Sequence, residues 1–256
     1  MPLTLTTLRN MPEIHPGDNL VKLILEAMDT DRVTVEDGDI LVLAQKIVSK
    51  AEGRLVNLVD IEAGDRAKQI AQVVQKDARL VELILRESRE VLRMRPGTII
   101  VEHRNGFVCA NAGIDHSNVR GEGKDPHLWY LLLPEDADQS AREVRSEVRR
   151  LAGVDVGAMI IDSHGRAWRN GTVGITIGLA GVPGIVDMRG MQDMYGYRLQ
   201  NTLIAAADEL AGAASLMMGQ ADEKSPVVVV KGFPYPLKES SSLKELIRPK
   251  DQDLFR

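Results

Sequence analysis

The sequence contains one cysteine, Cys109, among 256 residues. A single chain therefore cannot form an internal disulfide, which favours a reducing compartment. No stretch contains the roughly 18 apolar residues that a membrane-spanning helix needs, and the N-terminus lacks the basic and apolar regions of a signal peptide. We therefore predict a cytoplasmic protein without a membrane partner.

The chain also lacks an excess of positive charge. Its 32 Lys and Arg residues are outnumbered by 37 Asp and Glu residues, which gives a net charge of −5. A general nucleic-acid binder normally has a basic face, so we expect no nucleic-acid partner. The G-x-x-x-x-G-K-[ST] phosphate loop and the dinucleotide fingerprint are absent, and the five histidines lack zinc spacing. A nucleotide site in this chain would therefore have to be formed without either of these motifs.

Short runs of β-branched residues alternate irregularly with amphipathic helical patterns, which predicts a mixed α/β (α+β) fold rather than a doubly wound sheet. The hydrophobic share of 44% is sufficient for a buried core. Strands are expected over residues 39–44, 98–102, 106–110, 128–133, 154–161, 173–179 and 227–230. Helices are expected over residues 18–28, 66–74, 80–93, 140–152 and 200–218.

Two stretches that follow expected strands contain oxygen ligands. In residues 111–118, Asp115 and Asn118 offer the carboxylate and amide oxygens that suit Mg²⁺ or Mn²⁺, although that segment alone favours a simple Asx turn. In residues 160–170, Asp162 and Ser163 stand where an apolar strand is expected to end.

Two arginines follow Asp162 and Ser163 at a spacing of three residues. Arg166 and Arg169 could clamp anionic oxygens. A helix N-cap followed by a solvated charged turn explains this stretch equally well. Cys109 has no His/Asp partner pattern, so a buried residue is favoured over a nucleophile.

Two further stretches point to phosphate binding only in combination with the others. Lys46 and Lys50 are four residues apart, which places them on one face of a helical turn after a strand. Residues 218–225 form a loop between a helix end and a strand. Considered alone, the first is more typical of solvated lysines, and the second of an acidic loop after a C-cap glycine.

Taken together, these stretches resemble the coenzyme F420-0:γ-glutamyl ligase family, and the matching motifs extend through almost the whole chain. Several of them match at six or more positions. The motifs are residues 11–14 (MPEI), 16–18 (PGD), 36–39 (EDGD), 48–54 (VSKAEGR), 86–88 (RES), 107–118 (FVCANAGIDHSN), 133–136 (LPED), 165–169 (GRAWR), 187–190 (DMRG), 207–211 (ADELA) and 218–222 (MGQAD).

The resemblance implies one ligase domain over residues 1–256, or two intimate subdomains, in an intertwined homodimer without the reductase-like domain fused in some relatives. It implies that GTP is consumed to join L-glutamate to a deazaflavin precursor that ends in a lactyl carboxylate, first through an α-amide and then through γ-links. It also implies two divalent ions, Mg²⁺ or Mn²⁺, and K⁺. The expected chemistry forms an acyl phosphate that the glutamate amine attacks.

The resemblance further assigns roles to single residues. It implies that Asp115 and Asp162 are carboxylate metal ligands and that Ser163 and Gln220 bind a second metal. We assign Arg166 and Arg169 to anionic oxygens on physical grounds, as catalytic candidates. The implied nucleotide contacts are Met11, Pro12, Glu13, Ile14, Gln45, Lys46, Lys50, Asn118, Met218, Gly219, Gln220, Ala221, Asp222, Glu223, Lys224 and Ser225.

The chain departs from the family pattern at a few positions. Ser163 replaces the usual Thr and keeps its hydroxyl, His164 replaces the usual Phe, and Met188 replaces a Tyr. These changes preserve the metal site and leave the acceptor open. The alternatives are a ligase of the same chemistry that acts on another carboxylate, and a nucleotide- or cofactor-binding protein without turnover.

Overall fold

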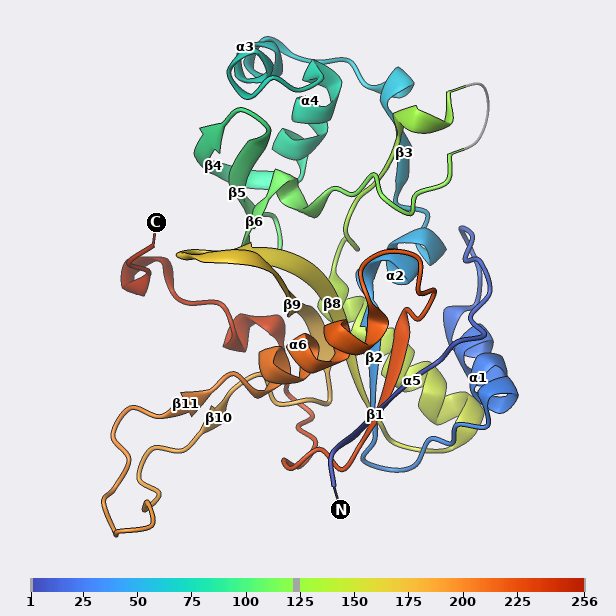
Figure 1. Cartoon of the computed structure of the whole chain (residues 1–256), viewed down its shortest axis with the longest axis vertical. Helices are drawn as coiled ribbons and strands as arrows, with labels where there is room; N and C mark the ends of the chain where they lie inside the picture. The colour runs from blue at the N-terminus through green and yellow to red at the C-terminus, as the bar shows by residue number, and fades with distance from the viewer. Residues whose placement is uncertain (1, 122–124, 256) are drawn as a thin grey trace.

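A five-stranded sheet forms the largest element of the computed structural model, which describes residues 2–121 and 125–255 (Figure 1). The strand order is β1-β12-β2-β8-β9, in which only the β2–β8 pair is parallel. The strands are β1 (Thr4–Thr7), β12 (Val227–Lys231), β2 (Ile40–Ala44), β8 (Gly157–Arg166) and β9 (Arg169–Ala180).

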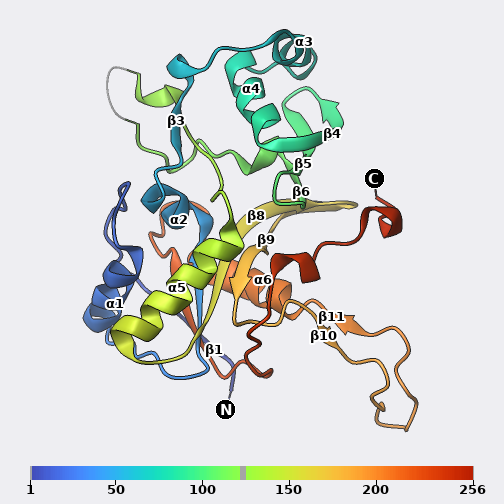
Figure 2. The same cartoon turned by 180° about the vertical axis from the view of Figure 1, so that it is seen from behind.

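Helices cover both faces of this sheet. Figures 1 and 2 show α6 (Ala206–Met218) on one face and α5 (Ala137–Ala152) on the other, with α1 (Leu20–Asp31) beside α5. Strand β2 lies between these layers, and its first four residues are fully buried. Its sequence, ILVLA, is the continuous apolar run expected of a strand that is covered on both sides.

A β-bulge lets β9 accommodate both helices. Ile160 pairs with Gly178 and Ile161 pairs with Thr176, so Ile177 is the extra residue. Gly174 and Gly178 lie an even number of residues apart, so in a regular strand they would face the same side. The bulge reverses the side-chain alternation, and the two glycines therefore face opposite helices. A Cβ on Gly174 would lie 2.4 Å from the Ser215 Cβ of α6, and a Cβ on Gly178 would lie 2.3 Å from the Ala137 backbone of α5.

A second region stands above one end of the large sheet (Figure 1). Its antiparallel sheet has the order β4-β5-β6, and a further strand pair joins β3 to β7. Strand β6 contacts β8, which connects the two regions. The elements are β3 (Leu55–Asn57), α3 (Asp65–Val74), α4 (Ala78–Arg86), β4 (Ser88–Arg95), β5 (Thr98–His103), β6 (Val108–Ala110) and β7 (Trp129–Leu131).

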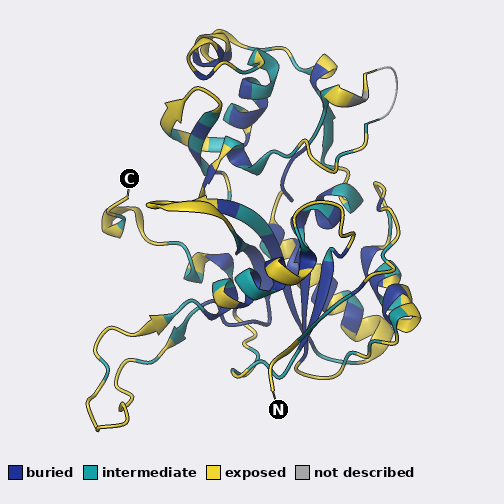
Figure 3. Cartoon of the chain, viewed as in Figure 1, coloured by how far each residue is buried: buried dark blue, intermediate teal, exposed yellow. Residues whose placement is uncertain are grey.

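An arm, residues 186–204, extends away from the body of the molecule (Figure 1). At its base β10 (Val186–Asp187) pairs with β11 (Leu203–Ile204), and farther out Gln192 and Arg198 form an isolated antiparallel bridge. The arm is mostly exposed in Figure 3. Among the residues that the structure describes, no helix is both long enough and apolar enough to cross a bilayer.

The mixed α/β class predicted from the sequence is confirmed. The prediction of a helix over residues 80–93 is wrong beyond Arg86, because residues 88–95 form β4 and pair with β5. Backbone pairing with β5 overrides the weak helical periodicity there. The helix predicted over residues 200–218 begins only at Ala206, since Leu203–Ile204 is β11. Strands β1, β3, β10 and β11 were not predicted.

The predicted end of a strand at residue 161 is also wrong. β8 continues to Arg166, because β9 pairs with it along that whole length. The stretch 160–170 is therefore a hairpin, and neither a strand end nor a helix N-cap. Asp162 and Ser163 consequently have fixed backbone positions within a strand.

We predict that Gly178→Ala lowers the free energy of unfolding by roughly 1–3 kcal/mol, because the added methyl group would overlap the α5 backbone. Denaturant unfolding would measure the loss. Gly212→Ala, within α6, is the matched control. A Cβ there would lie an ordinary 3.6 Å from Val173 of β9, and helix propensity favours Ala. Equal stability of Gly178→Ala and the wild type would contradict the proposed contact between β9 and α5.

Candidate functional site

A cavity of about 910 Å³ lies at the carboxyl end of β2, where its parallel pairing with β8 stops. Strand β2 ends at Ala44, opposite Ile161, whereas β8 continues. Asp162 and Ser163 therefore extend beyond the edge formed by β2, and both line the cavity. In α/β proteins, ligands commonly bind at such carboxyl ends.

Every residue predicted to contact metal or nucleotide lines this one cavity, although the chain elements that carry them are far apart in the sequence. Their roles as ligands stay predictions. The residues are Met11, Pro12, Glu13 and Ile14 before α1; Gln45, Lys46 and Lys50 on α2 (Gln45–Ala51); Asp115 and Asn118 after β6; Asp162 and Ser163 on β8; and Met218, Gly219, Gln220, Ala221, Asp222, Glu223, Lys224 and Ser225 between α6 and β12.

Asp115 is held by two donors from the start of α2. The side-chain amide of Gln45 donates to its Oδ2 at 2.7 Å, and the Lys46 Nζ lies 3.2 Å from the same oxygen. The Ser49 hydroxyl donates to the Gln45 Oε1, which turns the Gln45 nitrogen toward Asp115. Two backbone hydrogen bonds with Leu131 fix the main chain of Asp115. The carboxylate is therefore firmly oriented.

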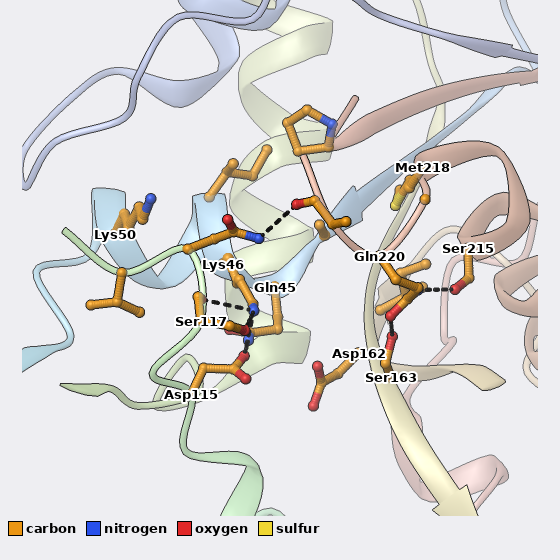
Figure 4. A pocket seen from close by; sticks show the side chains of 18 of the residues that line it. Gln45, Lys46, Lys50, Asp115, Ser117, Asp162, Ser163, Ser215, Met218 and Gln220 are labelled. Carbon is orange, nitrogen blue, oxygen red and sulfur yellow. Dashed lines mark hydrogen bonds and ion pairs between the residues drawn. The ribbon is translucent and has the colours of Figure 1, made fainter. Parts of the chain in front are cut away.

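Asp115 and Asp162 extend into the same space from different elements (Figure 4). Burial raises the pKa of the Asp115 carboxyl above its ordinary value, Lys46 opposes the rise, and the Asp162 carboxylate adds to it. The two carboxylates thus repel one another in a partly desolvated place. A cation between them would relieve this repulsion.

A short hydrogen-bonded chain fixes Gln220 on the opposite wall. The Ser163 hydroxyl donates to the Gln220 Oε1 at 2.9 Å, and the Gln220 amide nitrogen donates to the Ser215 hydroxyl at 3.1 Å (Figure 4). Ser215 lies near the end of α6. A hydroxyl oxygen and an amide oxygen are therefore adjacent at the edge of the cavity.

Two side-chain contacts connect the loops around the cavity. The Asn118 amide donates to the Ala221 carbonyl at 3.0 Å, and the Lys46 Nζ donates to both the carbonyl and the hydroxyl of Ser117. Burial lowers the pKa of the Lys50 ammonium, Glu13 opposes this, and Lys46 adds to the lowering. Phosphate oxygens are a suitable counter-charge for such a pair of lysines.

The donor set fits divalent cations that prefer oxygen. Asp115 and Asp162 offer carboxylates, while Ser163 and Gln220 offer neutral oxygens. Residues 2–121 and 125–255 contain no cluster of three or more His, Cys, Asp or Glu side chains arranged to hold a metal. A site with two carboxylates suits Mg²⁺, which usually takes one or two carboxylates from the protein and completes its coordination shell with phosphate and water.

Arg166 and Arg169 do not line the cavity. The continuation of β8 beyond Ser163 carries both to the exposed tip of the β8–β9 hairpin, where Arg166 donates to the Asn170 carbonyl. Trp168 lies between them with 87% of its surface exposed. Within one chain, the structure does not bring these arginines to the predicted metal ligands.

Three residues that contribute to the site were given no role from the sequence. Ser215 orients Gln220, Ser117 anchors Lys46, and His164 contacts Asp162. Ser215 and Ser117 carry no distinctive pattern, because a single serine is common on helices and in loops. His164 had a signal, since it follows a candidate ligand directly and stands where an apolar ring is usual.

Comparison with known proteins gives a consistent result. The family model described as F420-0:Gamma-glutamyl ligase matches residues 9–232. A protein from Methanopyrus kandleri named coenzyme F420:L-glutamate ligase is 45% identical and is aligned over 98% of this chain and 99% of its own length. Proteins of the same name from Methanothermobacter thermautotrophicus and Archaeoglobus fulgidus are 42% and 41% identical, over 100% and 96% of this chain and 100% and 93% of their own lengths.

We predict that Cys109 does not react as a nucleophile. Its side chain is buried, and burial raises the pKa of the thiol to about 12, with the Asp162 charge acting in the same direction. Only about 10⁻⁴ of the thiol would be ionised at pH 8. Iodoacetamide should therefore leave the folded protein unmodified, as measured by mass spectrometry, and should label it fully in guanidinium. Rapid labelling of the folded protein would show that Cys109 is accessible and activated.

Proposed function

The chain belongs to the F420-0:Gamma-glutamyl ligase family, and on this basis we propose that it joins L-glutamate to coenzyme F420-0 and adds further glutamate through γ-links, consuming GTP. The observation that best supports this proposal is the meeting of five separate segments around one cavity. They supply two facing carboxylates and several cationic side chains. Such a site suits phosphoryl transfer, which depends mainly on positioning and neutralisation of charge.

The proposed reaction has two steps. A carboxylate oxygen of the acceptor attacks the γ-phosphorus of GTP, the bond to the β-phosphate oxygen breaks, and GDP leaves. The glutamate amine then attacks the acyl carbon of the resulting acyl phosphate, expels inorganic phosphate, and loses a proton. Both steps gain from exclusion of water, because an acyl phosphate hydrolyses easily.

The chain's own residues have distinct tasks in this proposal. Lys46 and Lys50 approach the cavity from α2 and would neutralise phosphate oxygens. Asp115 and Asp162 would hold one divalent cation, and Ser163 and Gln220 a second. When bound, Mg²⁺ or Mn²⁺ would withdraw charge from the transferring phosphoryl group. K⁺ belongs to the same proposal, on the basis of the family resemblance.

We expect purified protein to add glutamate mass to the deazaflavin acceptor when it is incubated with GTP, Mn²⁺ or Mg²⁺, K⁺ and L-glutamate. Phosphate release should equal the number of glutamate residues added, as followed by a phosphate assay and mass spectrometry. A mass gain on another carboxylic acid but not on the deazaflavin would move the proposal to a different acceptor. Binding of GTP without any phosphate release, across a range of metals and acceptors, would refute catalysis.

Asp162→Asn is expected to reduce the rate of ligation by more than about 100-fold. Loss of a residue that only supports a metal ligand typically lowers activity by 10–100-fold, and loss of the ligand itself should lower it further. The thermal unfolding midpoint should remain close to that of the wild type, since the side chain keeps its volume. Asp65→Asn is the control, because Asp65 lies at the exposed start of α3, away from the cavity. Wild-type activity of Asp162→Asn would refute the metal assignment.

We also propose that the protein is a homodimer in which the arm packs against a second copy. An isolated two-stranded hairpin is at best marginally stable in water, yet within the part of the chain that the structure describes the base of this arm pairs only with itself. The arm carries an unusual share of the exposed large apolar side chains. They are Met191, Met194, Tyr195, Tyr197 and Leu203, of which Met194 and Tyr195 are each more than four-fifths exposed. Such a surface is typical of a protein interface.

The double variant Met194→Asp/Tyr195→Asp should convert the dimer to a monomer, because it places charge within the apolar surface of the arm. Light scattering after size-exclusion chromatography would measure the mass. Val59→Asp is the control, since Val59 is an exposed apolar residue after β3, outside the arm. A monomeric wild type, or an arm variant that remains dimeric, would contradict this proposal.

A further inference from the structure

A buried contact within β8 lies at the predicted metal site, where Asp162 and His164 both line the cavity. The Nε2 of His164 lies 2.9 Å from the Oδ2 of Asp162. These residues are two apart in a strand, so their side chains share one face. The side chains are only 5% and 12% exposed, respectively. The contact is therefore shielded from water, which strengthens it relative to an exposed pair.

The direction of this hydrogen bond follows from the chemistry of its partners. An ionised carboxylate only accepts hydrogen bonds, so the imidazole must carry a proton on Nε2 and donate it to Asp162. Among the described residues, the Nδ1 of His164 has no hydrogen-bond partner. The contact with Asp162 is thus the one hydrogen bond that orients this ring.

Aromatic packing also holds the imidazole in place. The ring of Phe107 lies 5.4 Å from that of His164, and Phe107 is itself stacked on His103 at 4.9 Å. Phe107 directly precedes β6, which contacts β8. The β4-β5-β6 region is therefore connected to the Asp162 carboxylate through two aromatic contacts and one hydrogen bond.

The hydrogen bond leaves the two oxygens of Asp162 with different tasks. Oδ2 accepts from His164, while Oδ1 remains for a ligand in the cavity that Asp162 lines. Asp115 is restrained in a comparable manner, since Gln45 and Lys46 both contact its Oδ2. Each of the two carboxylates thus has a donor on one oxygen, which fixes the direction of the other.

We infer that His164 is a positioning residue, which holds the Asp162 carboxylate so that its second oxygen can bind a divalent cation in the cavity. The inference rests on the proposed function, because it requires that Asp162 binds a metal. Supporting contacts of this kind typically change metal affinity or activity by 10–100-fold. The effect should fall on metal binding and leave the binding of guanine and ribose unchanged.

The test measures Mn²⁺ binding by electron paramagnetic resonance, with GDP present, in the wild type and three variants. His164→Phe retains a ring against Phe107 and removes the donor, so it should weaken Mn²⁺ binding about tenfold or more. His164→Gln places an amide nitrogen close to the former Nε2 and should recover most of the affinity. His103→Phe alters the same aromatic cluster without touching Asp162, and should bind Mn²⁺ like the wild type.

Kinetic measurements give a second criterion. In His164→Phe, the Mn²⁺ concentration for half-maximal ligation should rise about tenfold, while the KM for GTP at saturating Mn²⁺ stays within about twofold of the wild type. His164→Gln should again lie close to the wild type. A merely structural role would instead lower the unfolding midpoint of both His164 variants and leave the Mn²⁺ requirement of the folded fraction unchanged.

The outcomes separate the two proposals. Equal Mn²⁺ affinity of wild type and folded His164→Phe would overturn the role of His164 and leave the metal site intact. Equal weakening in His164→Phe and a folded His164→Gln would also overturn it, because the donor would then not be the cause. Failure of the folded wild type to bind Mn²⁺ with GDP would refute the proposed function itself.

Discussion

The structure depends on the unequal lengths of β2 and β8, which form a parallel strand pair. β2 and β8 run side by side until β2 ends at Ala44, where the chain turns into α2. β8 continues because β9 still provides hydrogen bonds to it. The residues of β8 beyond this point lose their neighbour on one side, which leaves space for a cavity. The backbone there remains rigid, since pairing with β9 satisfies it.

This arrangement gathers charge of both signs in a partly desolvated place. Asp115 and Asp162 are brought together from different elements, and each repels the other. Neighbouring donors compensate part of the free-energy cost of burying these charges. Gln45 and Lys46 contact Asp115, and His164 contacts Asp162. Buried charges without such partners would be strongly destabilising. The remaining repulsion between the two carboxylates supports the proposal that the cavity binds a cation.

The two regions of the molecule contribute in different ways. The large sheet supplies β2 and β8 and therefore fixes the floor of the cavity. The smaller region supplies the loop that carries Asp115 and the ring of Phe107 that packs on His164. Relative movement of the two regions would change the separation of the carboxylates. The contact of β6 with β8 connects the two regions, which suits the fixed positions that the proposed phosphoryl transfer would need.

The sequence alone determined the fold class, most strand positions, and the residues that meet at the cavity. Apolar periodicity reports burial, and the resemblance to the ligase family pointed to the residues that line the cavity. Tertiary structure decided where several elements end. Residues 88–95 form β4 because β5 is available as a partner, and β8 continues past Asp162 because β9 follows it. That continuation moved Arg166 and Arg169 to the hairpin tip and brought His164 into contact with Asp162. Such outcomes rest on contacts between residues distant in the sequence, and local periodicity contains no information about them.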